Sequence, residues 1–312
     1  MTSPARDEHG EVPFDGAERP ARQYDLDAHG VRLSMKEWGA ADAPPLLLMH
    51  GGFDFARTFD GFAPRLAAAG WRVVCWDQRG HGDSEHCPLY SFEGDTRDTL
   101  AVFDHVAPGR PVPVVGHSKG GALMTQLADV QPHRFRSLVN MDGIPYKRNI
   151  PDLAEHERTT MLANEVGGWL DHRRRTATNQ RKPGTIDELA KRRARMNPRL
   201  PTEWLQRLVT TGGFESDDGW RWKIDPAMRF GGFGPWRPEW ILMRLPGLPM
   251  PFLGILGAQM EEMGWGTPPA KVMPYLPRGG RCEVLDDVGH FVHVEAPDLV
   301  ASIVLEFLGD PS

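Results

Sequence analysis

The sequence predicts an α/β fold built on a mostly parallel, doubly wound sheet. Short apolar runs of strand length alternate with longer stretches in which apolar residues recur at helical spacing, a pattern typical of βαβ units. The chain has 312 residues, of which 40% are apolar and 25% charged, enough to bury the core of one large domain. The alternation stops near residue 144 and resumes near residue 249, so we predict an insertion between two core strands.

The boundaries of the expected elements follow from these runs and from the Gly, Pro and polar residues between them. We expect strands at residues 23–26, 32–38, 45–49, 71–76, 111–115, 136–141, 251–256 and 282–285. We expect core helices at residues 58–69, 94–106, 122–128 and 297–308, and helices of the insertion at residues 155–169 and 186–196.

Composition divides the chain into three parts. Residues 1–22 are polar and rich in Pro, Gly and charge, so we expect a disordered tail. Residues 23–143 and 249–312 should form the α/β core. Residues 144–248 are rich in Arg, Trp, Pro and Gly, and we interpret them as a lid.

Charge and cysteine content exclude several classes of protein. The net charge of −6, from 36 basic and 42 acidic residues, is too small and too mixed to favour a nucleic-acid or membrane partner. Cys75, Cys87 and Cys282 form no C-x-x-C pair, so we expect neither a disulfide framework nor a zinc site. The first residues lack the apolar segment of a signal peptide. We therefore predict a cytoplasmic protein that acts on a small molecule without metal or cofactor, with a homodimer as one option for its assembly.

The most informative stretch is Gly116-His117-Ser118-Lys119-Gly120, which lies between a buried strand and a helix. Gly-x-Ser-x-Gly at such a junction is the pattern of a nucleophile elbow, where the turn is too tight for bulky flanking side chains. It would hold the serine hydroxyl at the start of a helix, where the helix dipole favours developing negative charge. A glycine-rich turn with a serine helix cap would show the same five residues and catalyse nothing.

Further motifs accompany this elbow, in order and at sensible distances along the chain. They are His50-Gly51-Gly52-Phe53, the loop Asp77-Gln78-Arg79-Gly80-His81-Gly82-Asp83-Ser84, and Gly289-His290-Phe291. With them, residues 23–308 resemble the α/β-hydrolase fold family, in its lidded, single-domain serine branch. The resemblance implies a sheet of the α/β-hydrolase type, with a helical lid inserted between core strands.

The resemblance also implies a role for several side chains and backbone groups. Ser118 would attack an acyl carbonyl, and His290 would take the serine proton and return it to the leaving group. The oxyanion would be held by the backbone N–H of Lys119 and by that of Gly52 or Phe53.

The acid that should orient the histidine is not where most such relatives have it. After the strand that follows the insertion, Met260 occupies the place where an aspartate is expected. Asp142, at the end of the strand before the insertion, is our preferred acid, because a short carboxylate at a strand end is well fixed at the catalytic edge. Glu261 or Glu262 could serve instead, and an Asx turn or helix cap is the alternative interpretation of Asp142.

Other polar residues near these motifs are better explained by structure than by catalysis. We expect His117 to point away from the serine hydroxyl, and the Lys119 ammonium to be solvated or paired. His293 has no third ligand at a recognisable spacing, so we interpret it as structural, and Asp77 belongs to a loop that is structural in this family. The basic runs 172–175 and 191–193 are expected on solvated helix faces.

Aromatic residues suggest the nature of the substrate. Tryptophans are concentrated in the insertion, which favours a bulky apolar or aromatic group in the bound molecule. The residues we expect to line the pocket are Gly51, Phe53, His117, Trp169 and Trp236.

The sequence thus predicts a serine hydrolase that cleaves a small carboxylic ester or related acyl compound through an acyl-enzyme. A haloalkane dehalogenase or epoxide hydrolase is disfavoured, because the relatives with those activities have aspartate at the elbow. A C–C bond hydrolase, a lactonase or a cofactor-free oxygenase or perhydrolase would use nearly the same residues. A ligand-binding receptor with little turnover is a further alternative.

Overall fold

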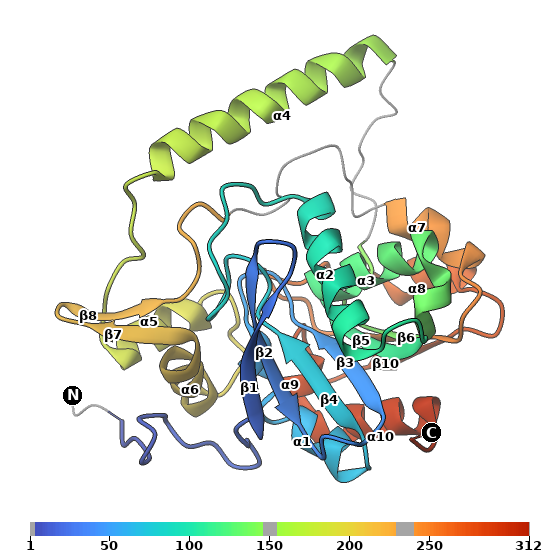
Figure 1. The fold of residues 1–312 in the computed structure, drawn as a ribbon, viewed down its shortest axis with the longest axis horizontal. Coiled ribbons are helices and arrows are strands. Elements are labelled where there is room, and N and C mark those ends of the chain that lie inside the picture. Colours follow the sequence, from blue (N-terminus) through green and yellow to red (C-terminus); the bar gives the residue numbers. More distant parts are fainter. Residues whose placement is uncertain (1–3, 146–154, 229–239, 312) are drawn as a thin grey trace.

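The chain folds around a mostly parallel sheet with helices on both sides, as Figure 1 shows. This computed structural model describes residues 4–145, 155–228 and 240–311. The strands of the main sheet are β1 (Arg22–Asp27), β2 (Arg32–Trp38), β3 (Pro45–Met49), β4 (Arg72–Trp76), β5 (Val112–His117), β6 (Phe135–Met141), β9 (Phe252–Gly257) and β10 (Arg281–Leu285). Their order across the sheet is β1-β2-β4-β3-β5-β6-β9-β10. β1, β2 and β4 pair antiparallel and all later neighbours pair parallel. The predicted fold class is confirmed.

Helices α1 to α8 fall between these strands, and α9 and α10 follow β10. Of the predicted helices, α2, α3, α4, α5 and α10 begin within a few residues of the expected positions, whereas α6 to α9 were not predicted. They are α1 (Ala63–Ala68), α2 (Phe92–Val106), α3 (Lys119–Val130), α4 (Glu155–Thr176), α5 (Ile186–Ala194), α6 (Thr202–Gly212), α7 (Trp240–Arg244), α8 (Pro269–Val272), α9 (Val292–Glu295) and α10 (Pro297–Leu308). Short 3-10 turns are η1 (Ala56–Phe59), η2 (Pro132–Arg134), η3 (Leu245–Gly247) and η4 (Met273–Tyr275). The helix expected at residues 58–69 is divided into η1 and α1, because Pro64 lacks an N–H and fits only the first turn of a helix.

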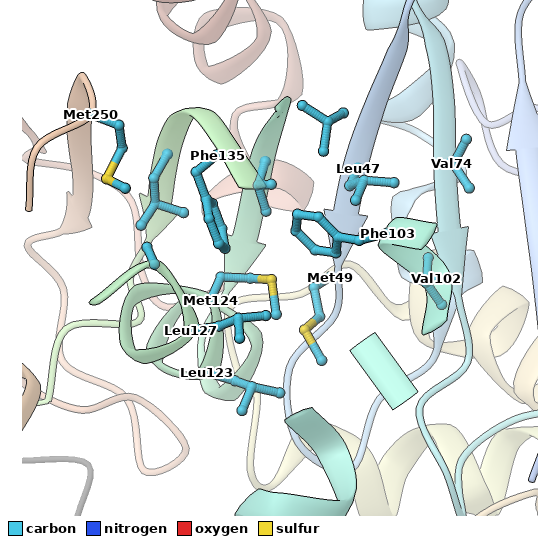
Figure 2. Close-up of a cluster of buried hydrophobic side chains, with 14 of the residues drawn as sticks. Leu47, Met49, Val74, Val102, Phe103, Leu123, Met124, Leu127, Phe135 and Met250 are labelled. Carbon is cyan, nitrogen blue, oxygen red and sulfur yellow. The ribbon is translucent and has the colours of Figure 1, made fainter. Parts of the chain in front are cut away.

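One face of the sheet is covered by α2 and α3. Leu47 and Met49 of β3 point to this face and pack with Phe103 of α2 and Leu127 of α3, as Figure 2 shows. All four side chains are at most 1% exposed. Fully burying a side chain of this size contributes about 1.5–3 kcal/mol, so this layer is a main source of the fold's stability.

The other face of the sheet is covered by α1, α9 and α10. Leu46 and Leu48 of β3 point to it, because successive side chains of a strand point to opposite faces. They belong to the same buried cluster as Leu66 of α1 and Val304 of α10. Strand β3 is therefore apolar at every position, and its carboxyl end leads directly into the loop that begins at His50.

The chain between β6 and β9 contains α4 to α7 and the two-stranded sheet of β7 (Gly213–Ser216) and β8 (Gly219–Trp222). Trp204 and Leu208 of α6 form a buried cluster that includes Phe55, which precedes η1, and Phe291, which precedes α9. This part of the insertion is thus packed on the core loops. In Figure 1, α4 stands apart from the sheet, and its described side chains are half-buried or exposed. That the insertion acts as a lid stays a prediction.

The amino-terminal segment corrects the expectation of a disordered tail for residues 4–22. Glu11 is 5% exposed, and its carboxylate accepts hydrogen bonds from the Arg57 guanidinium of η1, with 2.8 Å between Oε2 and Nη2. Arg207 of α6 lies 2.7 Å from the buried Asp60 carboxylate and 3.3 Å from Glu11. Burial alone would raise the pKa of Glu11, but its hydrogen bond and ion pair with Arg57 outweigh this and lower the pKa. These ion pairs fix a segment whose polar composition suggested disorder.

Candidate functional site

Ser118 lies at the tight turn between β5 and α3. Its φ of 52° is left-handed, a conformation that non-glycine residues rarely adopt and that costs about 1–2 kcal/mol. The flanking glycines permit the turn: a Cβ on Gly116 would lie 2.7 Å from the Cα of Gly121, and one on Gly120 would lie 2.5 Å from the Met49 carbonyl oxygen. This backbone is what the Gly-x-Ser-x-Gly pattern predicts.

Three of the predicted side chains are brought together at the carboxyl edge of the sheet. His290 Nε2 lies 2.9 Å from Ser118 Oγ, and His290 Nδ1 lies 2.6 Å from Asp142 Oδ2. His290 is 2% exposed and Asp142 is 9% exposed. Asp142 directly follows β6 with a φ of 45°, and its second oxygen accepts a hydrogen bond from Gly257 N at 3.3 Å. The arrangement is a continuous chain of contacts from carboxylate through imidazole to hydroxyl.

Glu261, the alternative acid, contacts the backbone and not the ring of the histidine. Its Oε2 accepts a hydrogen bond from His290 N at 2.7 Å. The adjacent amide of Gly289 donates to Glu295 Oε2 at 2.9 Å, and Glu295 pairs with Arg199. Burial and the neighbouring Glu295 raise the pKa of Glu261. The two glutamates therefore hold the backbone that presents the imidazole.

His117 supports the same backbone from the other side. Its Nε2 donates to the His290 carbonyl oxygen at 2.9 Å, and the two rings lie 4.8 Å apart between centroids. Burial lowers the pKa of His117 well below its usual value, so the ring is neutral. Its Nε2 therefore contacts the backbone of His290 and not the serine hydroxyl.

Residues 50–54, which we call the oxyanion loop after its predicted role, are fixed by a neutral histidine. His50 Nε2 accepts a hydrogen bond from Gln78 N at 3.0 Å, so its proton is on Nδ1, which donates to the Gly51 carbonyl oxygen at 2.7 Å. Burial lowers the pKa of His50 to about 3, consistent with this tautomer. In a trans peptide C=O and N–H point in opposite directions, so the N–H of Gly52 points away from the His50 ring.

Phe53 was the other predicted oxyanion donor from this loop, and its N–H has a different partner. It donates to His81 Nε2 at 3.2 Å, while His81 Nδ1 donates to the Arg79 carbonyl oxygen at 3.0 Å. Burial keeps the pKa of His81 well below its usual value and its ring neutral. Gly52 is therefore the better candidate of the two, and His81 makes structural contacts of the kind expected for the loop 77–84.

Lys119 is the first residue of α3, so the helix itself provides no acceptor for its backbone N–H. Its ammonium lies 2.7 Å from Asp95 Oδ2 and 3.1 Å from Gln78 Oε1. The expected pairing of this side chain is therefore found, and its N–H is left at the amino end of α3 beside Ser118.

Arg193 and Asp54 are functional candidates that the sequence analysis missed. Arg193 was expected on a solvated face, but Nη1 donates to the Phe53 carbonyl oxygen at 2.9 Å. Asp54 is 1% exposed, and burial raises its pKa to about 6 although the nearby positive charge of Arg193 opposes this. The signal was present in the spacing: residues 186, 189, 190 and 193 share one helix face, and the first three are buried.

The other residues predicted to line the substrate pocket differ in where they lie relative to Ser118 and the oxyanion loop. The Phe53 side chain packs on a buried apolar cluster that includes Tyr90, Ile224 and Met228, beside the oxyanion loop. Gly51 approaches the elbow closely, since a Cβ there would lie 3.1 Å from Ser118 Cβ. Trp169 is half-buried on α4. Trp236 lies outside the described residues.

His293 has the structural position that was expected. Its Nε2 lies 3.3 Å from the Thr58 hydroxyl, and burial lowers its pKa to about 3. The described parts of the chain contain no group of three or more His, Cys, Asp or Glu side chains placed to hold a metal ion. Within the same parts, no helix has the length and apolar character needed to cross a bilayer.

Comparison with known proteins places this geometry in a family. Residues 44–297 match the sequence model of the alpha/beta hydrolase fold. A serine hydrolase-like protein of Danio rerio is 28% identical over 207 residues, which cover 64% of this chain and 61% of the relative. Another, of Dictyostelium discoideum, is 31% identical over 118 residues, covering 37% of this chain and 33% of that protein. The matched residues thus make up between a third and three-fifths of the length of these curated relatives.

Similarity to solved structures extends over most of the chain. The thioesterase domain from the curacin biosynthetic pathway superposes with a TM-score of 0.78 at 24% identity, over 91% of this chain and 99% of that domain. At this identity the likeness bears on the fold alone. With the family match over residues 44–297, it leads to one conclusion: the chain belongs to the alpha/beta hydrolase fold family.

Proposed function

We propose that this protein is a serine hydrolase that cleaves a small carboxylic ester or a related acyl compound through an acyl-enzyme. The observation that carries the proposal is the pair of contacts at His290, 2.9 Å to the Ser118 hydroxyl and 2.6 Å to the Asp142 carboxylate. A nucleophile, a base within hydrogen-bond reach and a carboxylate that orients the base are the parts required for acyl transfer.

In the first step Ser118 Oγ forms a bond to the acyl carbon while its proton passes to His290 Nε2. The Asp142 carboxylate accepts a hydrogen bond from Nδ1–H and itself stays ionised. This bond keeps Nε2 unprotonated before the step, and the negative charge of Asp142 stabilises the imidazolium after it. The negative charge on the former carbonyl oxygen is stabilised by the N–H groups of Gly52 and Lys119. One such donor typically lowers the barrier by about 2.7–4 kcal/mol.

The tetrahedral intermediate then breaks its bond to the leaving oxygen, which takes the proton from His290. Water repeats the sequence on the acyl-enzyme: it loses a proton to His290, bonds to the acyl carbon, and releases the acid and free Ser118. The same groups serve both halves, so no further reactant is required.

The substrate that we propose is apolar or aromatic near the oxyanion loop. The supporting observation is the cluster of Tyr90, Ile224, Ala227 and Met228, on which the half-buried Phe53 side chain packs. An apolar cluster packed against the oxyanion loop favours a substrate whose acyl or alcohol group buries apolar surface on binding.

Labelling of the serine tests the proposal. We expect a fluorophosphonate probe to label the native protein and not the Ser118→Ala variant, and we expect the native protein to hydrolyse p-nitrophenyl esters or aryl esters. If the native protein reacts with neither, or if Ser118→Ala is labelled equally, the hydrolase assignment is wrong and a ligand-binding role becomes the better interpretation. Turnover of lactones but not of open esters would favour a lactonase.

A further inference from the structure

We propose that Arg193, on helix α5 of the insertion, is a positioning residue for the oxyanion loop. In this role it holds the backbone at Phe53 and Asp54 so that the Gly52 N–H keeps its direction. The inference rests on the proposed function, since an oxyanion donor matters only if an oxyanion forms. It makes the insertion part of the catalytic apparatus without direct contact with the reacting atoms.

The first argument is backbone conformation. Phe53 has a φ of 57°, which is left-handed and disfavoured for an aromatic residue, so neighbouring contacts must maintain it. Its N–H is held by His81 of the core, and its carbonyl oxygen accepts from Arg193 Nη1 at 2.9 Å. The Gly52–Phe53 peptide is thus fixed on its amide side by the core, and the next peptide is fixed by the insertion.

The second argument is charge. Asp54 follows Phe53 and is 1% exposed, and neither of its buried carboxylate oxygens has a hydrogen-bond partner with good geometry among the described residues. The positive charge of Arg193 is the largest influence that opposes the effect of burial on the pKa of this carboxylate, and the Thr58 hydroxyl and the Phe55 amide also lower this pKa. If the Arg193 charge is removed, the buried carboxylate loses its main electrostatic compensation, which favours movement of the loop.

The third argument is that Arg193 also contacts the segment that carries the base. Its guanidinium carbon lies 5.8 Å from the ring centre of Phe291, and the Phe291 ring lies 5.3 Å from that of His290. A cation over an aromatic face is attracted to it. One side chain therefore contacts both the oxyanion loop and the residue next to the proposed base.

Arg192 provides a matched control on the same helix. Its Nη1 and Nη2 donate to the carbonyl oxygens of Lys182 and Pro183, at 3.0 and 2.8 Å. Like Arg193 it is an arginine that binds backbone carbonyls, but its partners lie within the insertion. A variant at this position measures the effect of losing such bonds without touching the oxyanion loop.

The experiment compares Arg193→Met, Arg193→Lys and Arg192→Met with the native protein. Turnover of p-nitrophenyl butyrate, the rate of fluorophosphonate labelling and thermal unfolding are measured for each. We expect Arg193→Met to lower kcat and the labelling rate about 10- to 100-fold, and to change KM less than about twofold. This loss of kcat is smaller than the loss of about 10²–10³ that follows removal of a whole oxyanion donor, because the Gly52 N–H is displaced and not removed. Arg193→Lys, which keeps a cation and a donor, should recover most of this loss, and Arg192→Met should behave like the native protein.

Each other outcome has a definite meaning. Equal kcat for Arg193→Met and Arg192→Met would overturn the inference, as would a rise in KM with kcat unchanged, which would indicate substrate binding. If Arg193→Met does not fold, Asp54→Asn/Arg193→Met removes both buried charges, and near-native kcat in that variant would equally overturn it. Absence of labelling and turnover in the native protein would instead refute the proposed function, and the inference with it.

Discussion

Replacement of Asp142 by asparagine is the sharpest test of how the base is oriented. The carboxylate oxygen that lies 2.6 Å from His290 Nδ1 would be replaced by an amide, whose NH₂ group can donate to that nitrogen. The imidazole proton would then move to Nε2, and the ring could no longer accept the proton of Ser118. Asparagine tolerates left-handed backbone at least as well as aspartate, so the φ of 45° at this position should be kept and the fold preserved.

The size of the effect follows from the burial of the pair. The side chains of His290 and Asp142 are 2% and 12% exposed, so water cannot replace the lost acceptor. The corresponding substitution in the serine-protease triad lowers kcat about 10⁴-fold through the wrong tautomer. A loss of this size corresponds to about 5.4 kcal/mol of barrier. We therefore expect Asp142→Asn to lower kcat by about 10³- to 10⁴-fold.

The assay is turnover of a p-nitrophenyl ester, with Glu261→Gln as the matched control. Glutamine keeps a carbonyl oxygen for the backbone N–H of His290, so only the charge of the acceptor is lost. The difference between a charged and a neutral hydrogen bond is about 1 kcal/mol, or roughly fivefold in rate.

Thermal unfolding distinguishes an orientation effect from loss of the fold. We expect both variants to unfold within a few degrees of the native protein. The reasoning would be refuted if Asp142→Asn kept kcat within tenfold of the native value, and more strongly so if Glu261→Gln abolished turnover.

Two further predictions concern stability. Gly120→Ala would place a Cβ 2.5 Å from the Met49 carbonyl oxygen, so the elbow must shift; we expect a loss of roughly 1–3 kcal/mol or more in the free energy of unfolding, measured by urea denaturation. A variant as stable as the native protein would show that the turn has more room than its geometry indicates. Glu11→Gln should lose roughly 2 kcal/mol at pH 7, because the charge-assisted bonds to Arg57 are weakened. The pKa of Glu11 is lowered in the folded state, so its ionised form stabilises the fold above about pH 4.5, and this contribution is lost as the pH falls through the folded-state pKa. The difference between native and variant proteins in urea should therefore shrink in acid, and a difference that persists below that range would contradict the assignment.

Local sequence patterns predicted most of the core because the forces that form strands and tight turns act between near neighbours. The apolar run that becomes β5 and the glycines around Ser118 specify a buried strand and a sharp turn without reference to distant parts of the chain. The periodicity of residues 297–308 predicted α10 at its observed bounds. In contrast, α6 and the β7–β8 hairpin were not predicted, because their packing partners, Phe55 among them, lie far away in the sequence.

The sequence by itself predicted the fold class from the alternation of strand and helix patterns, the elbow at Ser118 from one short segment, and His290 as the base candidate from the resemblance to α/β hydrolases. Only the tertiary structure decided which carboxylate meets the imidazole, because Asp142 and His290 are 148 residues apart and meet only when β6 pairs with β9 and β9 with β10. The same holds for Arg193, whose charge predicted exposure. Its partial burial depends on α5 packing over the oxyanion loop, through a contact between residues 140 positions apart in the sequence that no local pattern encodes.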